Sequence, residues 1–352
     1  MKILFSGGGT MGSVSPLLAV AEQLKKEFLG CEMLWLGTKY GPEKLVVEKS
    51  NMLFRPICSG KLRRYFSLRN FVDPFKIFIG FCQAIGKIIK FKPDIILVAG
   101  SFVAVPVAAA GWLLRKKIVA HQQDILIGLA NKLIFPMATR VTVSFEDLLK
   151  VCPMDKGVFT GNPIRSFLAK ANKELAFEAF KLEKGLPVLL ILGGGTGAQA
   201  INDFFVKISD RLTEFCQIIH ICGAGKLVES TKNSRYHSTE FLTDQLADVY
   251  AAADLVITRA GLSTLTELAF LAKPTIIVPI PDSHQENNAA YFSKLNAAIY
   301  WKQKELDENE ALAQIKSLLN NREELQRLSN NIKGFAVADA AERFVNVVKD
   351  LL

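Results

Sequence analysis

The chain has 352 residues, of which 50% are apolar, and a formal net charge of +9; this length predicts two domains rather than one. No uninterrupted apolar stretch reaches the roughly 18 to 20 residues of a membrane-spanning helix. The cysteines form no CxxC pair and the histidines do not cluster, which favours reduced thiols in a cytosolic protein and argues against a zinc site.

The first half begins with a short apolar run, residues 1–5, which is too short for a signal peptide and predicts a buried strand. A glycine-rich turn follows, then helical spacing from Pro16 to Phe28 and a second strand over Met33 to Gly37. The glycines match GxGxxG, but no acidic residue closes the second strand, as dinucleotide binding would require. Tight packing of a helix on a strand explains the same glycine turn.

Residues 61–92 combine six phenylalanines and eight lysines or arginines with a single acid, Asp73. Basic residues beside exposed aromatic residues are typical of a surface that binds anionic lipid headgroups. We expect Phe71, Phe75, Phe78 and Lys76 at such a surface. A buried helix with basic edges explains the same apolar spacing. Nucleic acid is disfavoured as a partner, because no recognition module accompanies the charge.

Alternating strands and helices continue to a turn cluster at residues 161–165, which suits a hinge. The expected strands are residues 94–98, 117–120 and 141–145, and the expected helices are 105–114 and 128–134. His121 follows one of these strands, the usual place for site residues in open α/β sheets.

The pattern then restarts with a strand at 187–192, a second glycine loop at 193–199, a helix over 200–212 and a strand from Ile218. Such repetition predicts two doubly wound domains, each with a site at the carboxyl ends of its strands. His220, within the later strand, is either structural or packed against the cleft between the domains. An amphipathic helix is expected at the end of the chain, over 339–352.

The stretch from Ala253 to Ala289 has the order strand, glycine turn, helix, strand and polar loop, which predicts a parallel βαβ unit. A helix N-terminus after a glycine turn presents unpaired N–H groups and a positive dipole end, which suit a phosphate. Glu267, further along the helix, could hold a ribose diol. An ordinary βαβ unit with a solvated glutamate explains the same pattern.

Seven motifs in chain order resemble those of the MurG family of peptidoglycan N-acetylglucosaminyltransferases. The first glycine loop resembles GGTGGHxxP at residues 8–16, and Gly100-Ser101-Phe102 with Pro106 resembles GGYxxxP. The other five resemble HEQNxxxGxxNK, GNPVR, GGSQGAxxxN, RSGAxTxxE and HQxxNA, at residues 121–132, 161–165, 193–202, 259–267 and 284–289. Together the matches cover essentially the whole chain.

The resemblance implies an α/β protein with the GT-B fold: two Rossmann-like, doubly wound parallel-sheet domains facing a cleft. It implies inverting transfer of GlcNAc from UDP-GlcNAc to the C4 hydroxyl of MurNAc in lipid I, which gives lipid II for peptidoglycan. The expected partners are UDP-GlcNAc, an undecaprenyl-diphosphate MurNAc-peptide and an anionic membrane, with the protein peripheral on the cytoplasmic face of the inner membrane. Residues 1–162 with 339–352 would form the acceptor and membrane domain, and 163–338 the domain that binds UDP-GlcNAc.

Carried over by motif, Glu267 is expected to bind the ribose hydroxyls, Leu242 to lie along the uracil and Gln285 to contact GlcNAc. The other residues that the resemblance places around the donor, chiefly at its diphosphate, are Thr10, Met11, Gly12, Asp124, Arg165, Gly195, Thr196, Gly197, Arg259, Gly261, Leu262, Ser263, Thr264, Leu265, Thr266 and His284. No DxD triplet occurs, so we expect no metal site and no tightly bound cofactor. Helix N-termini and an arginine would then stabilise the departing UDP.

The chain departs from the family in its acceptor-side motifs. Ser13 occupies the position of a histidine that is a candidate for deprotonating the acceptor, and serine cannot be a general base at neutral pH. Met11 replaces a glycine, while Gln122 and Asp124 replace a glutamate and an asparagine. The candidate catalytic residues are therefore Ser13 by position, with Asp124 or His121 as replacement bases.

Three functions remain open from the sequence. The first is the lipid I N-acetylglucosaminyltransferase. The second is a GT-B transferase with another lipid or sugar acceptor, which the altered first loop favours. The third is a catalytically weakened nucleotide-sugar-binding protein at the membrane.

Overall fold

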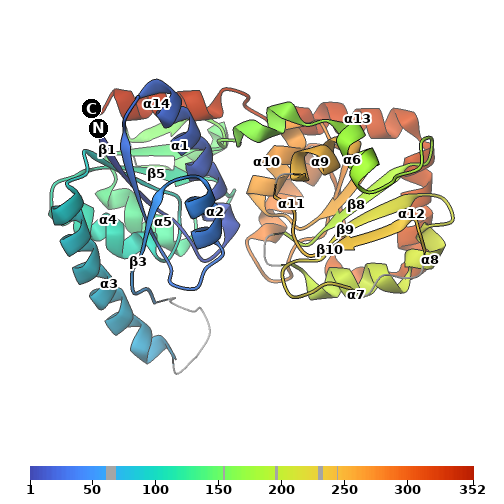
Figure 1. Ribbon diagram of the computed structural model, residues 1–352, viewed down its shortest axis with the longest axis horizontal. Coiled ribbons are helices and arrows are strands. Elements are labelled where there is room, and N and C mark those ends of the chain that lie inside the picture. Colours follow the sequence, from blue (N-terminus) through green and yellow to red (C-terminus); the bar gives the residue numbers. More distant parts are fainter. Residues whose placement is uncertain (61–68, 154, 195–196, 229–232, 244) are drawn as a thin grey trace. The chain divides into compact units, whose positions relative to one another are not determined.

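The computed structural model describes residues 1–60, 69–153, 155–194, 197–228, 233–243 and 245–352, without the side chains of 69–72. The chain divides into two compact units: unit 1 is Met1–Arg165 with Val337–Leu352, and unit 2 is Ser166–Ala336 (Figure 1). From the sequence, the first boundary was expected after residue 162 and the second before residue 339. In the structure the first boundary lies three residues later and the second two residues earlier.

Unit 1 is built on a parallel sheet of seven strands in the order β3-β2-β1-β4-β5-β6-β7. Its central strands are mostly buried apolar runs, as expected where helices cover both faces of a parallel sheet. The chain order reverses between β1 and β4, the switch point beside which such folds place their sites. The strands are β1 Lys2–Ser6, β2 Glu32–Gly37, β3 Leu53–Pro56, β4 Ile95–Val98, β5 Lys117–Gln122, β6 Arg140–Val143 and β7 Gly157–Phe159.

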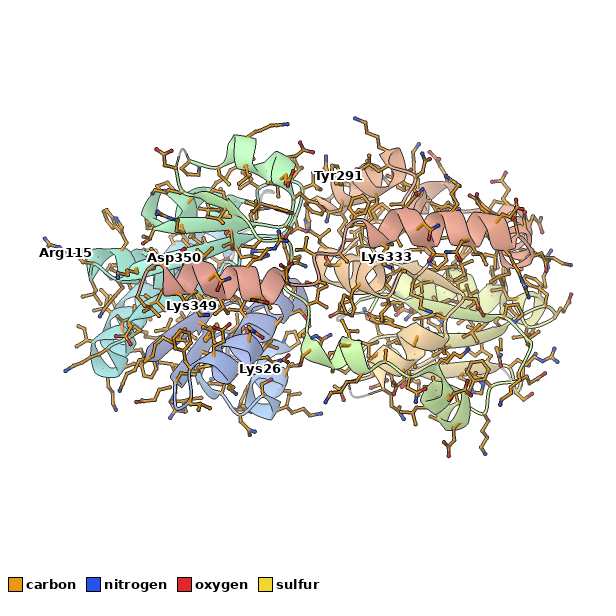
Figure 2. All side chains as sticks on the ribbon, turned by 90° about the horizontal axis from the view of Figure 1, so that it is seen from above. Lys26, Arg115, Tyr291, Lys333, Lys349 and Asp350 are labelled. Atoms are coloured by element: carbon orange, nitrogen blue, oxygen red, sulfur yellow. The ribbon has the colours of Figure 1, made fainter. Side chains whose placement is uncertain are left out.

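The helices of unit 1 include the last helix of the chain, α14, which packs beside α1 (Figure 1). Phe344 of α14 is fully buried in the core that β1, β2 and α1 form. An ion pair between Lys349 and Glu27 also joins α14 to α1; Lys349 is labelled in Figure 2. The helices are α1 Ser15–Glu27, α2 Glu43–Lys49, α3 Arg69–Phe91, α4 Ala104–Leu113, α5 Leu129–Ile134 and α14 Ala340–Lys349, with 3-10 turns at Met11–Ser13, Phe135–Met137 and Glu146–Val151.

Unit 2 has a parallel sheet of six strands in the order β10-β9-β8-β11-β12-β13, with its switch point between β8 and β11. The prediction of two doubly wound parallel sheets is confirmed. The strands are β8 Val188–Leu192, β9 Gln217–Ile221, β10 Tyr236–Thr239, β11 Leu255–Thr258, β12 Thr275–Ile277 and β13 Ile299–Tyr300. The helices are α6 Lys173–Ala179, α7 Gln199–Lys207, α8 Ser209–Leu212, α9 Leu246–Ala252, α10 Leu262–Phe270, α11 Gln285–Lys294, α12 Glu308–Asn320 and α13 Arg322–Lys333, with 3-10 turns at Ser166–Lys170 and Gln303–Glu305.

Helix α3 is amphipathic along its described part rather than buried all round. Asp73, Ala84 and Ile88 face the unit, whereas Phe75 is 71% exposed and Phe78 is 65% exposed. The side chain of Phe71 lies outside the described residues. Among the residues that the structure describes, no helix has the length and apolar character needed to cross a membrane.

Candidate active site

The start of α10 in unit 2 is an open helix N-terminus at the carboxyl end of β11. Gly261 is its N-cap, with extended backbone and no capping side chain. A Cβ placed on Gly261 would meet nothing within 4 Å, so the space in front of the turn is open. The first turn of α10, which begins at Leu262, therefore presents the positive dipole end that suits a phosphate group.

Two buried side chains connect the segment that precedes this turn to neighbouring elements. Arg259 donates through Nη1 to the carbonyl oxygens of Val278 and Pro279, each at 3.0 Å. Asn288 of α11, which is fully buried, donates to the carbonyl oxygen of Ala260 at 3.0 Å. Burial lowers the pKa of Arg259 from its ordinary value. Arg259, which the sequence placed at the donor, thus joins the end of β11 to the segment after β12.

Glu267 lies inside α10 and is 5% exposed. Tyr250 of α9, itself buried, donates from its hydroxyl to Glu267 Oε2 at 3.3 Å. The carboxylate is therefore oriented by a neighbouring helix, as a binding group needs to be. Thr266 donates to the Leu262 carbonyl at 2.7 Å, so its hydroxyl bonds to the preceding turn of its own helix.

Three further predicted donor residues, His284, Gln285 and Leu242, lie in or beside loops that follow strands of unit 2. Gln285 begins α11 and accepts from the Ile280 N–H at 3.2 Å, while His284 is its exposed N-cap. Leu242 is half-buried in the loop after β10. Gly195 and Thr196 lie outside the described residues. Arg165 is half-buried at the end of the first segment of unit 1.

The second glycine loop packs tightly against the end of β9. Gly197 has φ +68°, and a Cβ there would lie 2.3 Å from the Cys222 carbonyl oxygen, so only glycine fits. Asn202 of α7 donates to the same carbonyl at 2.9 Å. His220 bonds through its two nitrogens to Asn202 Oδ1 at 3.1 Å and Tyr236 Oη at 2.6 Å. His220 is therefore structural.

In unit 1, the side chain of Ser13 forms a hydrogen bond within the first glycine loop. Its Oγ accepts the Gly8 N–H at 3.1 Å, and its side chain is only 6% exposed. Met11 packs against the core of the unit instead of projecting over the loop. Gly12 closely approaches Gln123, whose Nε2 would lie 3.0 Å from an added Cβ, while Thr10 is exposed.

Glu43, which the sequence did not single out, joins this loop to the end of β2. The carboxylate is fully buried and accepts from Gly9 N at 3.1 Å, Thr38 N at 2.7 Å and Thr38 Oγ1 at 2.5 Å. The N–H groups of Gly8 and Gly9 are thus already bonded within the protein and are not presented to a phosphate.

His121 and Gln122 organise the loop after β5. The ring of His121, 1% exposed, bonds to Thr142 Oγ1 at 2.9 Å and Asn162 Oδ1 at 3.0 Å. Gln122 donates through Nε2 to the carbonyl oxygens of Asp124 at 2.6 Å and Leu126 at 3.2 Å, which a glutamate could not do. His121 is placed to hold the strand end, whereas Asp124 lies half-buried on the loop.

The buried histidines predict a pH dependence of stability. Burial lowers the pKa of His121 and of His220 to about 4, whereas an unfolded histidine titrates near 6.5. As the pH falls below 6.5, the unfolded state takes up protons that the folded state does not, so the unfolding free energy decreases. At pH 5 we expect each histidine to lower it by about 2 kcal/mol, measured by urea unfolding at pH 7 and 5.

The variant His220→Asn is the control for this prediction, because it should lose one of the two contributions. Equal unfolding free energies at pH 7 and pH 5 in the unchanged protein would contradict it.

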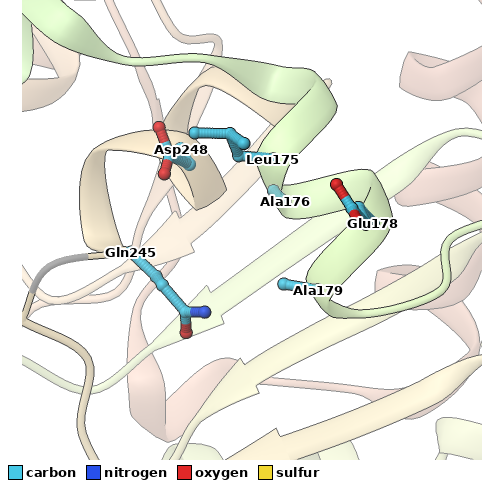
Figure 3. A pocket seen from close by; sticks show the side chains of 6 residues that line it. All are labelled: Leu175, Ala176, Glu178, Ala179, Gln245 and Asp248. Carbon is cyan, nitrogen blue, oxygen red and sulfur yellow. The ribbon is translucent and has the colours of Figure 1, made fainter.

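Each unit contains a cavity. A cavity of about 350 Å³ in unit 2 lies between α6 and α9 (Figure 3), and none of the predicted site residues lines it. A cavity of about 880 Å³ in unit 1 lies beside the first glycine loop and the first turns of α3.

In the described part of the chain, no three His, Cys, Asp or Glu side chains are grouped to hold a metal ion.

Comparison with known proteins assigns both units to one enzyme class. The glycosyltransferase family 28 N-terminal domain matches residues 3–143, and the glycosyltransferase family 28 C-terminal domain matches residues 188–344. A UDP-N-acetylglucosamine--N-acetylmuramyl-(pentapeptide) pyrophosphoryl-undecaprenol N-acetylglucosamine transferase of Clostridium botulinum (strain Kyoto / Type A2) is 40% identical over 91% of this chain and 92% of its own. The protein of the same name from Clostridium perfringens (strain 13 / Type A) is 38% identical over 99% and 98%.

Solved structures share the architecture. MurG of Acinetobacter baumannii is 26% identical, has a TM-score of 0.72 and covers 99% of both chains. A UDP-GlcNAc 2-epimerase of Neisseria meningitidis, bound to UDP-GlcNAc, has a TM-score of 0.73 at 15% identity over 99% of this chain and 100% of its own. The epimerase is similar in fold alone.

Proposed function

Because the chain belongs to glycosyltransferase family 28, among the pyrophosphoryl-undecaprenol N-acetylglucosamine transferases, we propose that it makes lipid II. It transfers GlcNAc from UDP-GlcNAc to the C4 hydroxyl of the MurNAc sugar of the lipid-linked acceptor, with inversion. The observation that carries the proposal is the 40% identity to transferases of this name across 91% of the chain.

The donor binds at the carboxyl ends of the strands of unit 2. The open N-terminus of α10 binds the diphosphate. Glu267, which is oriented by Tyr250, accepts hydrogen bonds from the ribose hydroxyls. When the bond between the GlcNAc anomeric carbon and the UDP oxygen breaks, negative charge develops on the departing phosphate. The positive dipole end of α10 stabilises that charge.

The acceptor hydroxyl loses its proton as its oxygen bonds to the anomeric carbon. Of the three candidate residues, Ser13 is bonded to Gly8, and His121 is buried with both ring nitrogens engaged. Asp124 is a carboxylate on a half-buried loop, so we assign it the role of general base. This assignment replaces the family's histidine, in the loop after β1, by a carboxylate in the loop after β5.

The exposed face of α3 is the surface that rests on the membrane. Phe75 and Phe78 are exposed beside Lys76, and Trp112 at the end of the adjacent α4 is 59% exposed. Apolar side chains flanked by basic ones bind anionic headgroups. Such a surface supports a peripheral position on the cytoplasmic face of the inner membrane, where a lipid-linked acceptor is available.

Replacing both Phe75 and Phe78 with serine is expected to reduce binding to vesicles that contain anionic lipid by at least about 100-fold. Each buried phenylalanine contributes about 1.5–3 kcal/mol, and each 1.4 kcal/mol is tenfold. Sedimentation with liposomes measures the change. Leu227→Ser, at a 56% exposed apolar side chain of unit 2, is the matched control. Equal binding by the two variants would contradict the proposal that α3 contacts the membrane.

A transferase that uses another acceptor is favoured by one observation: Ser13, in place of the family's histidine, is built into the loop itself. The two functions are separated by offering UDP-GlcNAc with either lipid-linked MurNAc-pentapeptide or a lipid-linked GlcNAc. Transfer to the first supports lipid II synthesis, and transfer only to the second supports the alternative. Donor binding without transfer to any acceptor is the result expected of a weakened binding protein.

A further inference from the structure

The cavity of about 880 Å³ in unit 1 has walls that are tied together by hydrogen bonds. The end of β2 and the first glycine loop are joined through Glu43, which bonds to Thr38 and Gly9. The segment after β3 is joined to α3, because the Cys58 N–H donates to Gln83 Oε1 at 2.7 Å. The cavity is therefore preformed, with a volume in the range of small-molecule binding sites.

The charges of the cavity favour an anion. Among the residues that the structure describes, Lys39, which is exposed, and Lys76 line it together with a single acid, Asp73. Lys76 and Asp73 form an ion pair at 3.5 Å, so Lys39 supplies the positive charge that this pair does not neutralise. The Lys39 ammonium lies 5.1 Å from the centre of the Tyr40 ring, which also lines the cavity.

The rest of the lining suits a peptide better than a pyrophosphate. Pro42, Ile57 and Phe102 provide apolar walls, and Ser59 and Gln83 provide polar groups for amides. A pyrophosphate is smaller and would need a concentration of unpaired N–H groups. The nearest loop does not offer them, because the Gly8 and Gly9 amides are bonded to Ser13 and Glu43.

We infer that this cavity is the subsite for the peptide carried by the acceptor, with Lys39 facing a peptide carboxylate. The inference rests on the proposed function, since a pentapeptide on the muramyl sugar occurs in the name of the relatives' substrate. A peptide attached to the sugar through its amino end keeps a free terminal carboxylate. The cavity borders Gly9 of the loop whose motif resembles the acceptor side of the family.

The test compares two acceptors that carry the same short, water-soluble lipid: one bears the pentapeptide and the other a muramyl group without peptide. The unchanged protein is expected to have a lower KM for the pentapeptide acceptor. Lys39→Ala should raise that KM about tenfold, the effect of about 1.4 kcal/mol, and Lys39→Glu should raise it further. Neither change should alter the KM for the peptide-free acceptor by more than about twofold.

Lys44→Ala is the matched control, because Lys44 is exposed on α2 and does not line the cavity. Its KM values should equal those of the unchanged protein. The inference is overturned if the unchanged protein has equal KM values for the two acceptors. It is also overturned if the Lys39 variants weaken both acceptors equally, which would assign the cavity to the pyrophosphate. Transfer to neither acceptor would instead reject the proposed function, and the subsite with it.

Discussion

Replacing Glu267 with alanine is expected to lower kcat/KM for UDP-GlcNAc by about 100-fold. A hydrogen bond to a charged group contributes about 1.5–3 kcal/mol, and each 1.4 kcal/mol is tenfold. The carboxylate is 5% exposed and receives the Tyr250 hydroxyl at 3.3 Å, so it is already oriented before the ribose arrives. Steady-state transfer kinetics with varied UDP-GlcNAc measure the loss.

Tyr250→Phe is the matched variant for this prediction. It keeps the ring and removes one neutral donor, so we expect a decrease of about fivefold, the effect of about 1 kcal/mol. Thermal unfolding of both variants shows whether unit 2 remains folded. Unchanged transfer by a folded Glu267→Ala protein would contradict the ribose contact.

Replacing Phe344 with alanine is expected to lower the unfolding free energy of unit 1 by about 3–5 kcal/mol. Phe344 lies on α14, near the end of the chain, and is fully buried in the core that the first strands and α1 form. Its removal leaves a cavity in a unit that is otherwise built from residues 1–165. Urea unfolding followed by the fluorescence of Trp35, a buried residue of the same core, measures the change.

Asn346→Ala is the control on the same helix, because Asn346 is exposed. Its unfolding free energy should change by no more than about 0.5 kcal/mol. If the two variants unfolded at the same urea concentration, α14 would not be part of the stabilising core of unit 1.

The order of elements could be predicted because apolar strands, glycine turns and helical spacing repeat in both halves. Breaks within a helix were harder to predict. The helix expected over 200–212 is two helices, α7 and α8. Ser209 donates through its hydroxyl to the Val206 carbonyl at 2.7 Å, and Thr213 donates to the Ser209 carbonyl at 3.1 Å. Such side-chain bonds to the backbone compete with the helix and are not visible in apolar periodicity.

The orientation of α3 could not be decided from sequence alone, because its apolar residues extend nearly around the helix. Tertiary packing decides it: Ala84 and Ile88 are buried, whereas Phe75 and Phe78 are exposed. The phenylalanines are thus left on the surface although smaller residues of the same helix are in the core.

For the candidate site, motif spacing indicated which strand ends and helix starts the residues follow, but not their side-chain partners. Arg259 and His121 fit motifs, yet both are buried and bonded to neighbouring backbone or side chains. The sequence did not single out Tyr250, Asn288 or Glu43 as site residues. Their partners, Glu267, Ala260 and Gly9, lie at least 17 residues away in the chain. Only the fold brings such pairs together.

The most direct test of the proposed function is to incubate the protein with UDP-GlcNAc and lipid-linked MurNAc-pentapeptide and to measure UDP and disaccharide together. We predict that one UDP is released for each lipid-linked GlcNAc-MurNAc disaccharide formed, and that no UDP is released without acceptor. Tight binding of UDP-GlcNAc with no disaccharide formed would contradict the account.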